Sequence, residues 1–221
     1  MSEILIAKNI YKSYGNTPVL KNINLSVKRG EFLSIMGESG SGKSTLLSIL
    51  GGNIKPDAGE VFIDGVCISS ASDKELSALR RTSLGFVFQS LNLIPTLNIT
   101  DNIMLPIYLH RANVSEARER LCELCEKLGI SHLLSSFPED ISGGEAQRAA
   151  IARAMLHSPS VLMLDEPTGS LDSKNACSLL ELLAKLNAEN ALTVIQVTHS
   201  NRAASYGNRT VGICDGELLS L

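Results

Sequence analysis

Short apolar runs alternate with segments of helical spacing along most of this 221-residue chain. Four apolar runs have the length of a β-strand, and they cover residues 31–36, 84–89, 160–164 and 192–198. Helical patterns separate these runs, most clearly at residues 116–128 and 146–157. Such alternation is typical of α/β proteins, whose sheet is largely parallel. The pattern therefore predicts an α/β fold with a mostly parallel sheet.

Two further apolar runs end in Asp-Gly, a sequence favoured in tight hairpin turns. Residues 61–63 precede Asp64-Gly65, and residues 211–213 precede Asp215-Gly216. We expect antiparallel β ribbons at both places, flanking the parallel sheet.

A helical stretch interrupts the strand pattern between residues 90 and 158. We expect one domain of residues 1–221, with a core of residues 1–89 and 159–221 and an inserted helical lobe of residues 90–158. The first part of the lobe, residues 90–109, is unusually apolar for a connection. Either all of it fills the core of the lobe, or an exposed remainder forms a groove for a partner helix.

Composition and charge narrow the class of protein. Twenty Lys and Arg against 23 Asp and Glu give a net charge of −3. A general nucleic-acid binder carries a basic excess, so we expect no nucleic-acid partner. The chain contains no apolar run of about 18 residues and no signal-peptide pattern at its start, which predicts a cytoplasmic protein. The five scattered cysteines fit a reducing compartment, and Cys122 and Cys125 share one helical pattern as small thiols.

A glycine-rich stretch lies between a predicted strand and a predicted helix. It fits G-x-x-x-x-G-K-[ST], whose glycines let backbone N–H groups point at phosphate oxygens. The helix start adds further unpaired amides. We expect Lys43 to contact the β- and γ-phosphates and Ser44 to coordinate Mg²⁺. The predicted nucleotide ligands of this loop are Gly37, Ser39, Gly40, Ser41, Gly42, Lys43, Ser44 and Thr45.

Two acidic residues, Asp165 and Glu166, follow four consecutive apolar residues at 161–164. Such a run suits a strand buried on both faces, and acids at its carboxyl end emerge where α/β sheets bind ligands. We expect Asp165 in the Mg²⁺ coordination shell and Glu166 as the general base for the attacking water. The alternative is that the two acids merely end a strand before Pro167.

A capping box, Ser142-Gly143-Gly144-Glu145, opens the helical pattern at 146–157. Its two glycines expose backbone N–H groups in the first turn, so this is a second helix start suited to a phosphate. Spacing alone favours an ordinary capped helix.

Residues 141–154 read ISGGEAQRAAIARA and closely resemble the signature of the ATP-binding-cassette (ABC) family, with the other motifs in the order of that family. Tyr14 lies where the family places an aromatic that stacks on adenine, although Tyr11 is an alternative. The resemblance implies that His199 faces the γ-phosphate and that Gln89 senses Mg²⁺ and the lobe. It also implies that nucleotide is bound by Ser142, Gly143, Gly144, Glu145 and Asp172, the last in a loop that crosses to a partner subunit.

Membership of this family would imply an ATPase with a P-loop core, ATP and Mg²⁺ as ligands, and a head-to-tail homodimer around two ATP molecules. It would also imply an integral membrane permease as partner, with the chain on the cytoplasmic face of the membrane. Two alternatives remain. A soluble ABC ATPase of DNA repair or translation would need a long coiled-coil insert, zinc modules or a second cassette in tandem, and a small P-loop kinase would not need the signature.

Within the family, residues 80–89 and 92–97 resemble the ATPases of lipoprotein-release, macrolide-export and antimicrobial-peptide-resistance systems. That group also includes a cell-division ATPase that acts on its membrane partner without evident transport. Three residues depart from the usual pattern. Ile141 stands in place of leucine, Ala146 in place of glutamine, and Ser200 in place of the aspartate that follows the switch histidine.

Overall fold

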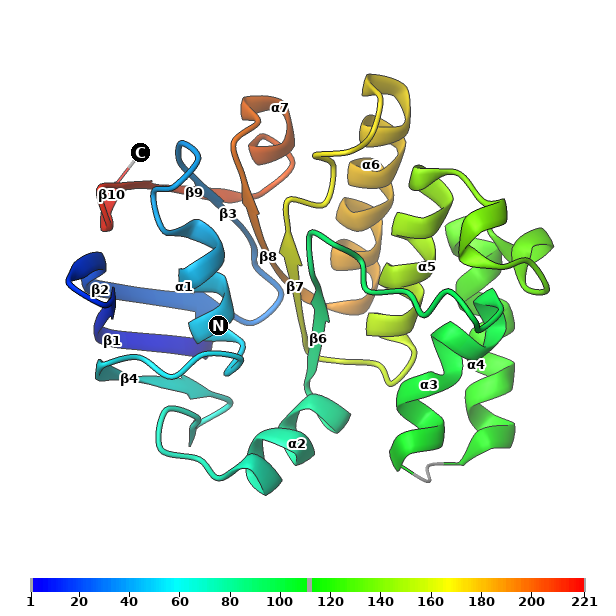
Figure 1. Cartoon of the computed structure of the whole chain (residues 1–221), viewed down its shortest axis with the longest axis horizontal. Helices are drawn as coiled ribbons and strands as arrows, with labels where there is room; N and C mark the ends of the chain where they lie inside the picture. The colour runs from blue at the N-terminus through cyan, green and yellow to red at the C-terminus, as the bar shows by residue number, and fades with distance from the viewer. Residues whose placement is uncertain (1, 111–112, 221) are drawn as a thin grey trace.

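The computed structural model describes residues 2–110 and 113–220. Its strands are β1 (Glu3–Tyr14), β2 (Thr17–Lys28), β3 (Phe32–Met36), β4 (Ala58–Ile63), β5 (Val66–Cys67), β6 (Leu84–Val87), β7 (Val161–Asp165), β8 (Thr193–Thr198), β9 (Arg209–Cys214) and β10 (Glu217–Ser220). Its helices are α1 (Lys43–Leu50), α2 (Asp73–Thr82), α3 (Ile99–His110), α4 (Val114–Leu128), α5 (Gly143–Met155), α6 (Ser173–Asn190) and α7 (Asn201–Ala204), with short 3-10 turns η1 (Ser131–Leu133) and η2 (Pro138–Asp140). Figure 1 shows how they are arranged.

A six-stranded sheet forms the centre of the molecule, in the order β10-β9-β3-β8-β7-β6. Neighbours from β9 to β6 pair in parallel, and β10 pairs with β9 in the antiparallel direction. β7 and β8 are buried along their whole length because both faces of the sheet are covered. The mostly parallel sheet predicted from the apolar runs is confirmed.

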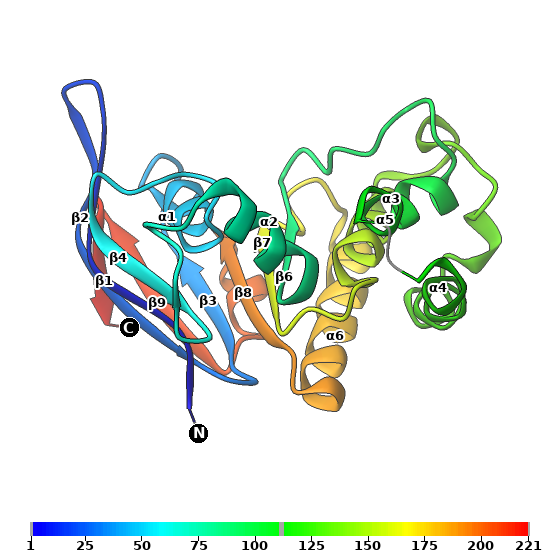
Figure 2. The same cartoon turned by 90° about the horizontal axis from the view of Figure 1, so that it is seen from below.

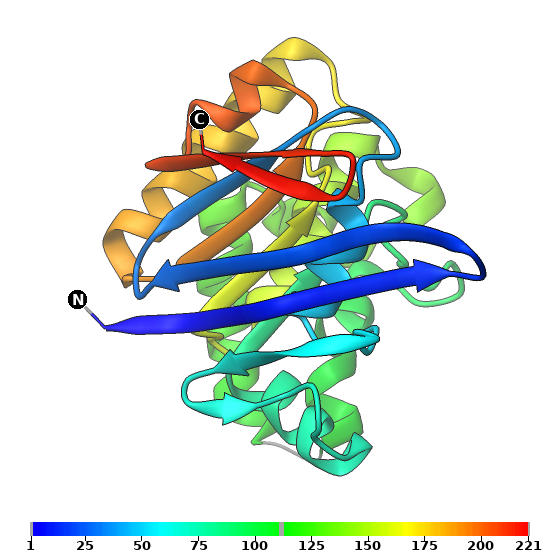
Figure 3. The ribbon, with the colours of Figure 1, turned by 90° about the vertical axis from the view of Figure 1, so that its left-hand side faces the viewer.

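A second, antiparallel sheet has the order β2-β1-β4-β5 and lies in front of the first in Figure 3. The turn at Asp64-Gly65 joins β4 to β5, and the turn at Asp215-Gly216 joins β9 to β10. All four turn residues have positive φ, between 48° and 80°, as a type I′ hairpin requires. Both predicted ribbons are therefore confirmed.

The long β1–β2 hairpin was not among the predicted strands. Its register shifts at several points, for example between Ala7 and Ile10, so its apolar residues do not keep a period of two. Asn9 and Asn22 adopt left-handed backbone conformations, with φ of 50° and 53°. The hairpin matters for function because Tyr14 lies at its tip.

The six-stranded sheet lies between the second sheet with α1 on one side and the helices α3 to α6 on the other (Figure 2). A hydrophobic core lies on each of its two faces. One fills the space between the two sheets and surrounds α1, and the other lies beneath α3 to α6. Successive residues of a strand serve different cores: Leu33 and Ile35 belong to the first, and Phe32 belongs to the second. This alternation follows from the two-residue period of a strand.

The segment between β6 and β7 carries α3, α4, η1, η2 and α5, and its described residues form no strand. The predicted helix at 116–128 lies within α4, where Asn113 caps the start and Gly129 ends the helix at φ 69°. α5 also packs against β6, so it joins the lobe to the sheet. The division of the chain at residues 89 and 158 stays a prediction.

The two cysteines of α4 differ in exposure. Cys125 is buried and its burial raises the pKa of its thiol to about 11, whereas Cys122 is exposed. A thiol with a raised pKa is a poor nucleophile, which agrees with a packing role. Among the described residues, no helix is both long and apolar enough to cross a membrane.

Candidate nucleotide-binding site

The glycine-rich loop connects the end of β3 to the start of α1. Gly40 and Gly42 have φ of 83° and 99°, a left-handed conformation that L side chains rarely adopt. A Cβ atom at Gly42 would also lie 2.9 Å from the carbonyl oxygen of Val19. The loop therefore needs glycine for its shape, which turns the backbone into an anion-binding nest.

The backbone N–H groups at the start of α1 are available to bind an anion. Its N-cap is Gly42, and no side chain of the described residues caps it. Lys43 is buried at 6% exposure, and its Nζ donates to the carbonyl oxygens of Gly37 at 2.8 Å and Glu38 at 2.6 Å. These contacts fold the ammonium back over the loop, where a bound phosphate would meet it.

Ser44 and Asp165 come together although 121 residues separate them. The Ser44 hydroxyl donates to Asp165 Oδ1 at 2.9 Å, at the carboxyl end of β7. Burial raises the pKa of Asp165, while the hydrogen bond from Ser44 opposes this shift. A hydroxyl and a buried carboxylate are hard oxygen ligands, so the pair fits Mg²⁺.

Glu166 and His199 follow neighbouring parallel strands, β7 and β8, and therefore emerge side by side. His199 Nδ1 lies 3.1 Å from Glu166 Oε1. A carboxylate accepts hydrogen bonds, so the tautomer that carries its proton on Nδ1 can donate to Glu166. Glu166 has φ of 48°, a left-handed conformation that costs a non-glycine residue free energy.

One cavity of about 650 Å³ collects most of the predicted ligands. Tyr14 lines it and Tyr11 does not, so the structure brings Tyr14 to the phosphate-binding loop. Gln89 also lines it, two residues beyond the end of β6, so the strand is shorter than predicted. The other predicted residues that line it are Ser39, Gly40, Gly42, Lys43, Ser44, Thr45, Glu166 and His199.

Some residues of this region were placed differently or missed. Gly37 and Ser41 line a separate hollow on the other side of the loop, toward β9 and β10. Val19, Glu38 and Gly169 line the nucleotide cavity but were not predicted. Val19 lies on β2, the strand that forms a hairpin with β1 and Tyr14, and Glu38 lies within the glycine-rich loop. No motif in the sequence marks either residue as a ligand.

The signature residues lie outside this cavity, at the start of α5. The capping box is confirmed: Ser142 Oγ accepts from Glu145 N at 3.4 Å, and Ser142 N donates to Glu145 Oε2 at 2.8 Å. Ser142 Oγ also donates to the same carboxylate oxygen at 2.6 Å, and these bonds lower the pKa of Glu145. Asp172 caps α6 by accepting from the backbone N–H groups of Lys174 and Asn175. A Cβ atom on Gly144 would lie 3.8 Å from that of Asn175, so the starts of α5 and α6 are adjacent (Figure 1).

Arg153 of α5 was not predicted as a site residue. Its Nη1 donates to the carbonyl oxygen of Asn92 at 2.6 Å, and its Nη2 donates to that of Leu91. Both of these loop residues have positive φ, 57° for Leu91 and 51° for Asn92. The guanidinium therefore holds the strained backbone at Leu91 and Asn92, which directly follows the turn containing Gln89 and Ser90. A basic residue within an otherwise apolar helical stretch is the signal that could have revealed it.

Ser200, which stands where the family usually has aspartate, caps a short helix. Its side chain accepts from Ala203 N at 3.3 Å and caps α7. Serine and aspartate are both good N-caps, so the departure leaves the backbone after His199 supported.

The parallel sheet, the glycine-rich loop and the acids at the end of β7 define a P-loop nucleotide-binding protein. The family model described as "ABC transporter" matches residues 20–169. The bacitracin export ATP-binding protein BceA of Halalkalibacterium halodurans is 44% identical over 219 residues, covering 97% of this chain and 87% of that protein. The lipoprotein-releasing system ATP-binding protein LolD of Aquifex aeolicus is 45% identical over 219 residues, covering 99% and 97%.

A solved dimeric structure of the ATP-binding cassette MJ0796, in a post-hydrolysis state with ADP and Pi, superimposes with a TM-score of 0.89. It is 42% identical, with coverage of 97% of this chain and 96% of that chain. MJ0796 comes from Methanocaldococcus jannaschii. This chain belongs to the ABC transporter family. It is the ATPase subunit of such a transporter, which binds and hydrolyses ATP.

Proposed function

We propose that two copies of this chain bind two ATP molecules between them, and that this pair closes and reopens to drive a membrane permease. The separation of the motifs within one chain carries the proposal. Lys43, Glu166 and His199 line one cavity, whereas Ser142 and Asp172 lie outside it. A second copy placed head to tail would bring its own signature to the open side of the cavity. The dimeric structure of the relative MJ0796 supports this arrangement.

The open space around Gly143 points the same way. A Cβ atom there would meet nothing within 4 Å, and the residue has no positive φ. Neither packing nor backbone conformation within one chain therefore calls for glycine at this position. Glycine leaves room for another molecule to approach the N–H groups at the start of α5, as an incoming γ-phosphate would.

Within the site each residue has a distinct role. The loop amides and Lys43 bind the phosphates, and Tyr14 stacks on the adenine ring. Ser44, Asp165 and Gln89 would hold Mg²⁺, which would neutralise charge on the β- and γ-phosphates when bound. Glu166 accepts a proton from the attacking water, and its contact with His199 Nδ1 at 3.1 Å holds the imidazole at the edge of the cavity.

The family and the residues after Gln89 support a permease as partner. Ile99, Ile103 and Met104 are completely buried, so part of this apolar stretch fills the lobe. Ile94 and Leu97 remain half-exposed. Asn102, itself buried, fixes their loop by bonding Ile94 N at 2.7 Å and the Leu97 carbonyl at 2.9 Å. A rigid, partly apolar loop suits a short permease helix, which would keep this chain on the cytoplasmic face of the membrane.

Names of relatives suggest the kind of cargo. BceA is a bacitracin export protein and LolD belongs to a lipoprotein-releasing system. We therefore propose that the permease exports or extracts a lipophilic substrate or a peptide. The alternative is that ATP hydrolysis changes the conformation of a membrane protein that transports nothing. Transport assays in vesicles that contain this chain and the permease encoded by a neighbouring gene would distinguish the two.

Mixing two variants tests the shared site. Ser142→Arg blocks the start of α5, and Lys43→Ala removes the phosphate-binding cation. Neither variant alone should hydrolyse ATP, because each pair would lack one half of both sites. A mixture should regain activity, since a mixed pair has one intact site, up to about half the activity of a wild-type pair. Ser115→Arg, the same change at the exposed start of α4, is the matched control and should leave activity intact.

ATP binding by the monomer decides whether the signature acts within its own chain or on a partner. Ser142→Arg should still bind ATP as a single chain, because the phosphate-binding loop is untouched. Loss of ATP binding by this monomer would show that the signature acts within its own chain.

A pull-down tests the permease partner. Leu97→Asp should abolish recovery of an integral membrane protein, whereas Val66→Asp on the exposed β5 should not. Failure of the wild-type chain to recover any membrane protein would contradict the permease partner.

A further inference from the structure

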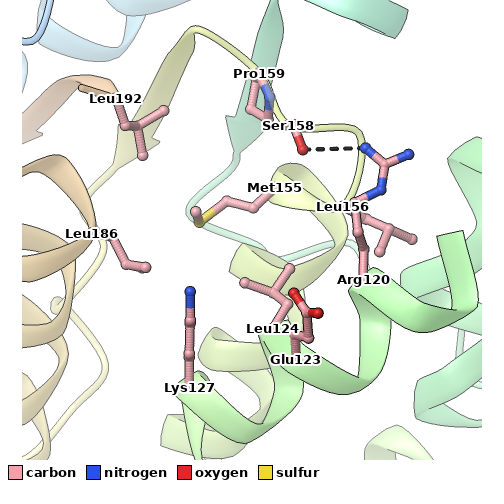
Figure 4. A pocket seen from close by; sticks show the side chains of 10 residues that line it. All are labelled: Arg120, Glu123, Leu124, Lys127, Met155, Leu156, Ser158, Pro159, Leu186 and Leu192. Atoms are coloured by element: carbon pink, nitrogen blue, oxygen red, sulfur yellow. Dashed lines mark hydrogen bonds between the residues drawn. The ribbon is translucent and has the colours of Figure 1, made fainter. Parts of the chain in front are cut away.

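A second cavity, of about 370 Å³, lies at the end of α5 opposite to Ser142. Its walls come from α4, from the last residues of α5 and the connection that follows, from α6, and from the residue before β8 (Figure 4). It shares no lining residue with the nucleotide cavity. Nothing in the ATPase chemistry requires it.

The floor of this cavity is apolar. Leu124 of α4, Met155 of α5 and Leu186 of α6 converge on it, together with Leu192 (Figure 4). Leu186 and Leu192 are 2% and 4% exposed, so their side chains form a fixed base. A ligand with an aliphatic part would gain free energy by covering the half-buried Leu124 and Met155.

The rim of the cavity carries two cations and one acid, all on α4. Arg120 is engaged already, with Nη1 on Ser158 Oγ at 3.3 Å and Nη2 on Glu116 at 3.1 Å. The side-chain ammonium of Lys127 makes neither an ion pair nor a hydrogen bond within residues 2–110 and 113–220. Figure 4 shows its ammonium directed into the space between Leu186 and Leu124. An unpaired ammonium over an apolar floor is complementary to an anionic head on an aliphatic tail.

We propose that this cavity binds a small amphiphile with a single carboxylate. The carboxylate pairs with Lys127 and the aliphatic part covers Leu124 and Met155. Glu123 on the same rim repels a second negative charge, so monoanions are preferred over phosphates of higher charge. The volume is at the low end of the range for small-molecule sites, which limits the ligand to a short chain.

The position of the cavity gives a bound ligand a structural effect. It would touch α4 of the lobe and α6, which packs against the sheet, at the foot of the helix that carries the signature. Binding therefore stabilises the lobe orientation seen in this structure by mass action. At a ligand concentration of ten times Kd, the melting temperature should rise by about 3 to 6 °C.

Sodium octanoate is the probe, and methyl-labelled methionine is the reporter. The Met155 methyl signal should shift as octanoate is added, with a Kd on the order of 1 mM for a ligand of this size. Met104 and Met163 are completely buried in the two cores and should not shift. The full chain is used without nucleotide, so the result does not depend on the ATPase cycle.

Variants and matched probes decide the outcome. Lys127→Gln should weaken octanoate binding about fivefold, whereas Arg118→Gln, an exposed residue of the same helix outside the cavity, should not change it. Acetate, which has the charge alone, and octyltrimethylammonium, which has the tail with opposite charge, should each bind at least tenfold more weakly. No shift of Met155, equal binding of the cationic probe, or an unchanged Kd in Lys127→Gln would each overturn the proposal.

Discussion

Replacement of Glu166 by glutamine tests whether this residue is the general base. Glutamine has the same shape, and its amide oxygen can still accept the hydrogen bond from His199 Nδ1, 3.1 Å away in the structure. The left-handed backbone at φ 48° costs glutamine no more than it costs glutamate. The variant should therefore fold and keep His199 in place. What it loses is the ability to accept a proton from water.

General-base catalysis contributes about 10² to 10⁴ in rate, so kcat should fall by that factor. The loss corresponds to about 2.7 to 5.5 kcal/mol in the activation barrier. ATP affinity should stay within about twofold of wild type, because Lys43 and the loop amides are unchanged. A pair that binds ATP and does not hydrolyse it should persist, and size-exclusion chromatography should then show a long-lived dimer.

Phosphate release at saturating ATP and Mg²⁺ measures kcat, and a fluorescent nucleotide measures affinity. Glu181→Gln, the same change at an exposed position of α6, is the control and should behave as wild type. If Glu166→Gln hydrolyses ATP at a near-normal rate, Glu166 is not the base. If it loses ATP binding instead, its role is in the ground state and the assignment of Lys43 as the main phosphate ligand is incomplete.

Three further changes test other parts of the site. Tyr14→Ala should raise the Michaelis constant for ATP at least fivefold with little change in kcat, and Tyr11→Ala should leave both unchanged, because only Tyr14 lines the cavity. Asp165→Asn should abolish Mg²⁺-dependent hydrolysis yet raise the nucleotide-free stability by about 1 kcal/mol in urea at pH 8. Burial raises the pKa of Asp165 in the folded state, so its ionisation destabilises the fold as pH rises through that pKa, and the gain should shrink as pH falls toward the unfolded value. Arg153→Met should leave two carbonyl groups without donors, lower thermal stability by about 1 to 3 kcal/mol, and reduce kcat through Gln89, whereas an unchanged kcat would show that the turn holds without the guanidinium.

The parts of the fold that the sequence predicted share one property: each is marked by residues that lie close together in the sequence. The four buried strands are short apolar runs whose two faces both lie against helices or the second sheet, so composition alone marks them. The capping box at Ser142 is likewise local, because its partners lie three residues apart. Local patterns of this kind need no knowledge of the rest of the chain.

The β1–β2 hairpin lacked such a pattern. Register shifts and left-handed asparagines at 9 and 22 break its alternation, and the residues of β4 that pair with β1 lie 47 to 58 positions further along the chain. Arg153 was missed for a related reason, since its partners, Leu91 and Asn92, are 62 and 61 residues distant. Only the tertiary structure joins them. The roles of Tyr14 and Gln89 came from family resemblance, and the structure adds that both line the cavity.

The two helix starts of the proposed site differ in how open their backbone amides are, and this difference predicts an order of nucleotide binding. At α1, the described residues provide no side-chain cap and no acid in the first turn, so its amides are open to an anion. At α5, the Ser142 side chain already accepts a hydrogen bond from one backbone amide. The Glu145 carboxylate adds a negative charge there, and its hydrogen bonds to Ser142 lower the pKa of this carboxyl group. Free ATP should therefore bind first to α1, where Lys43 adds a positive charge. In the proposed pair, the start of α5 would contact a phosphate after the other chain has bound the nucleotide and offset its entropic cost. We therefore expect a single chain to bind ATP through α1 alone, with the second contact favourable in a pair.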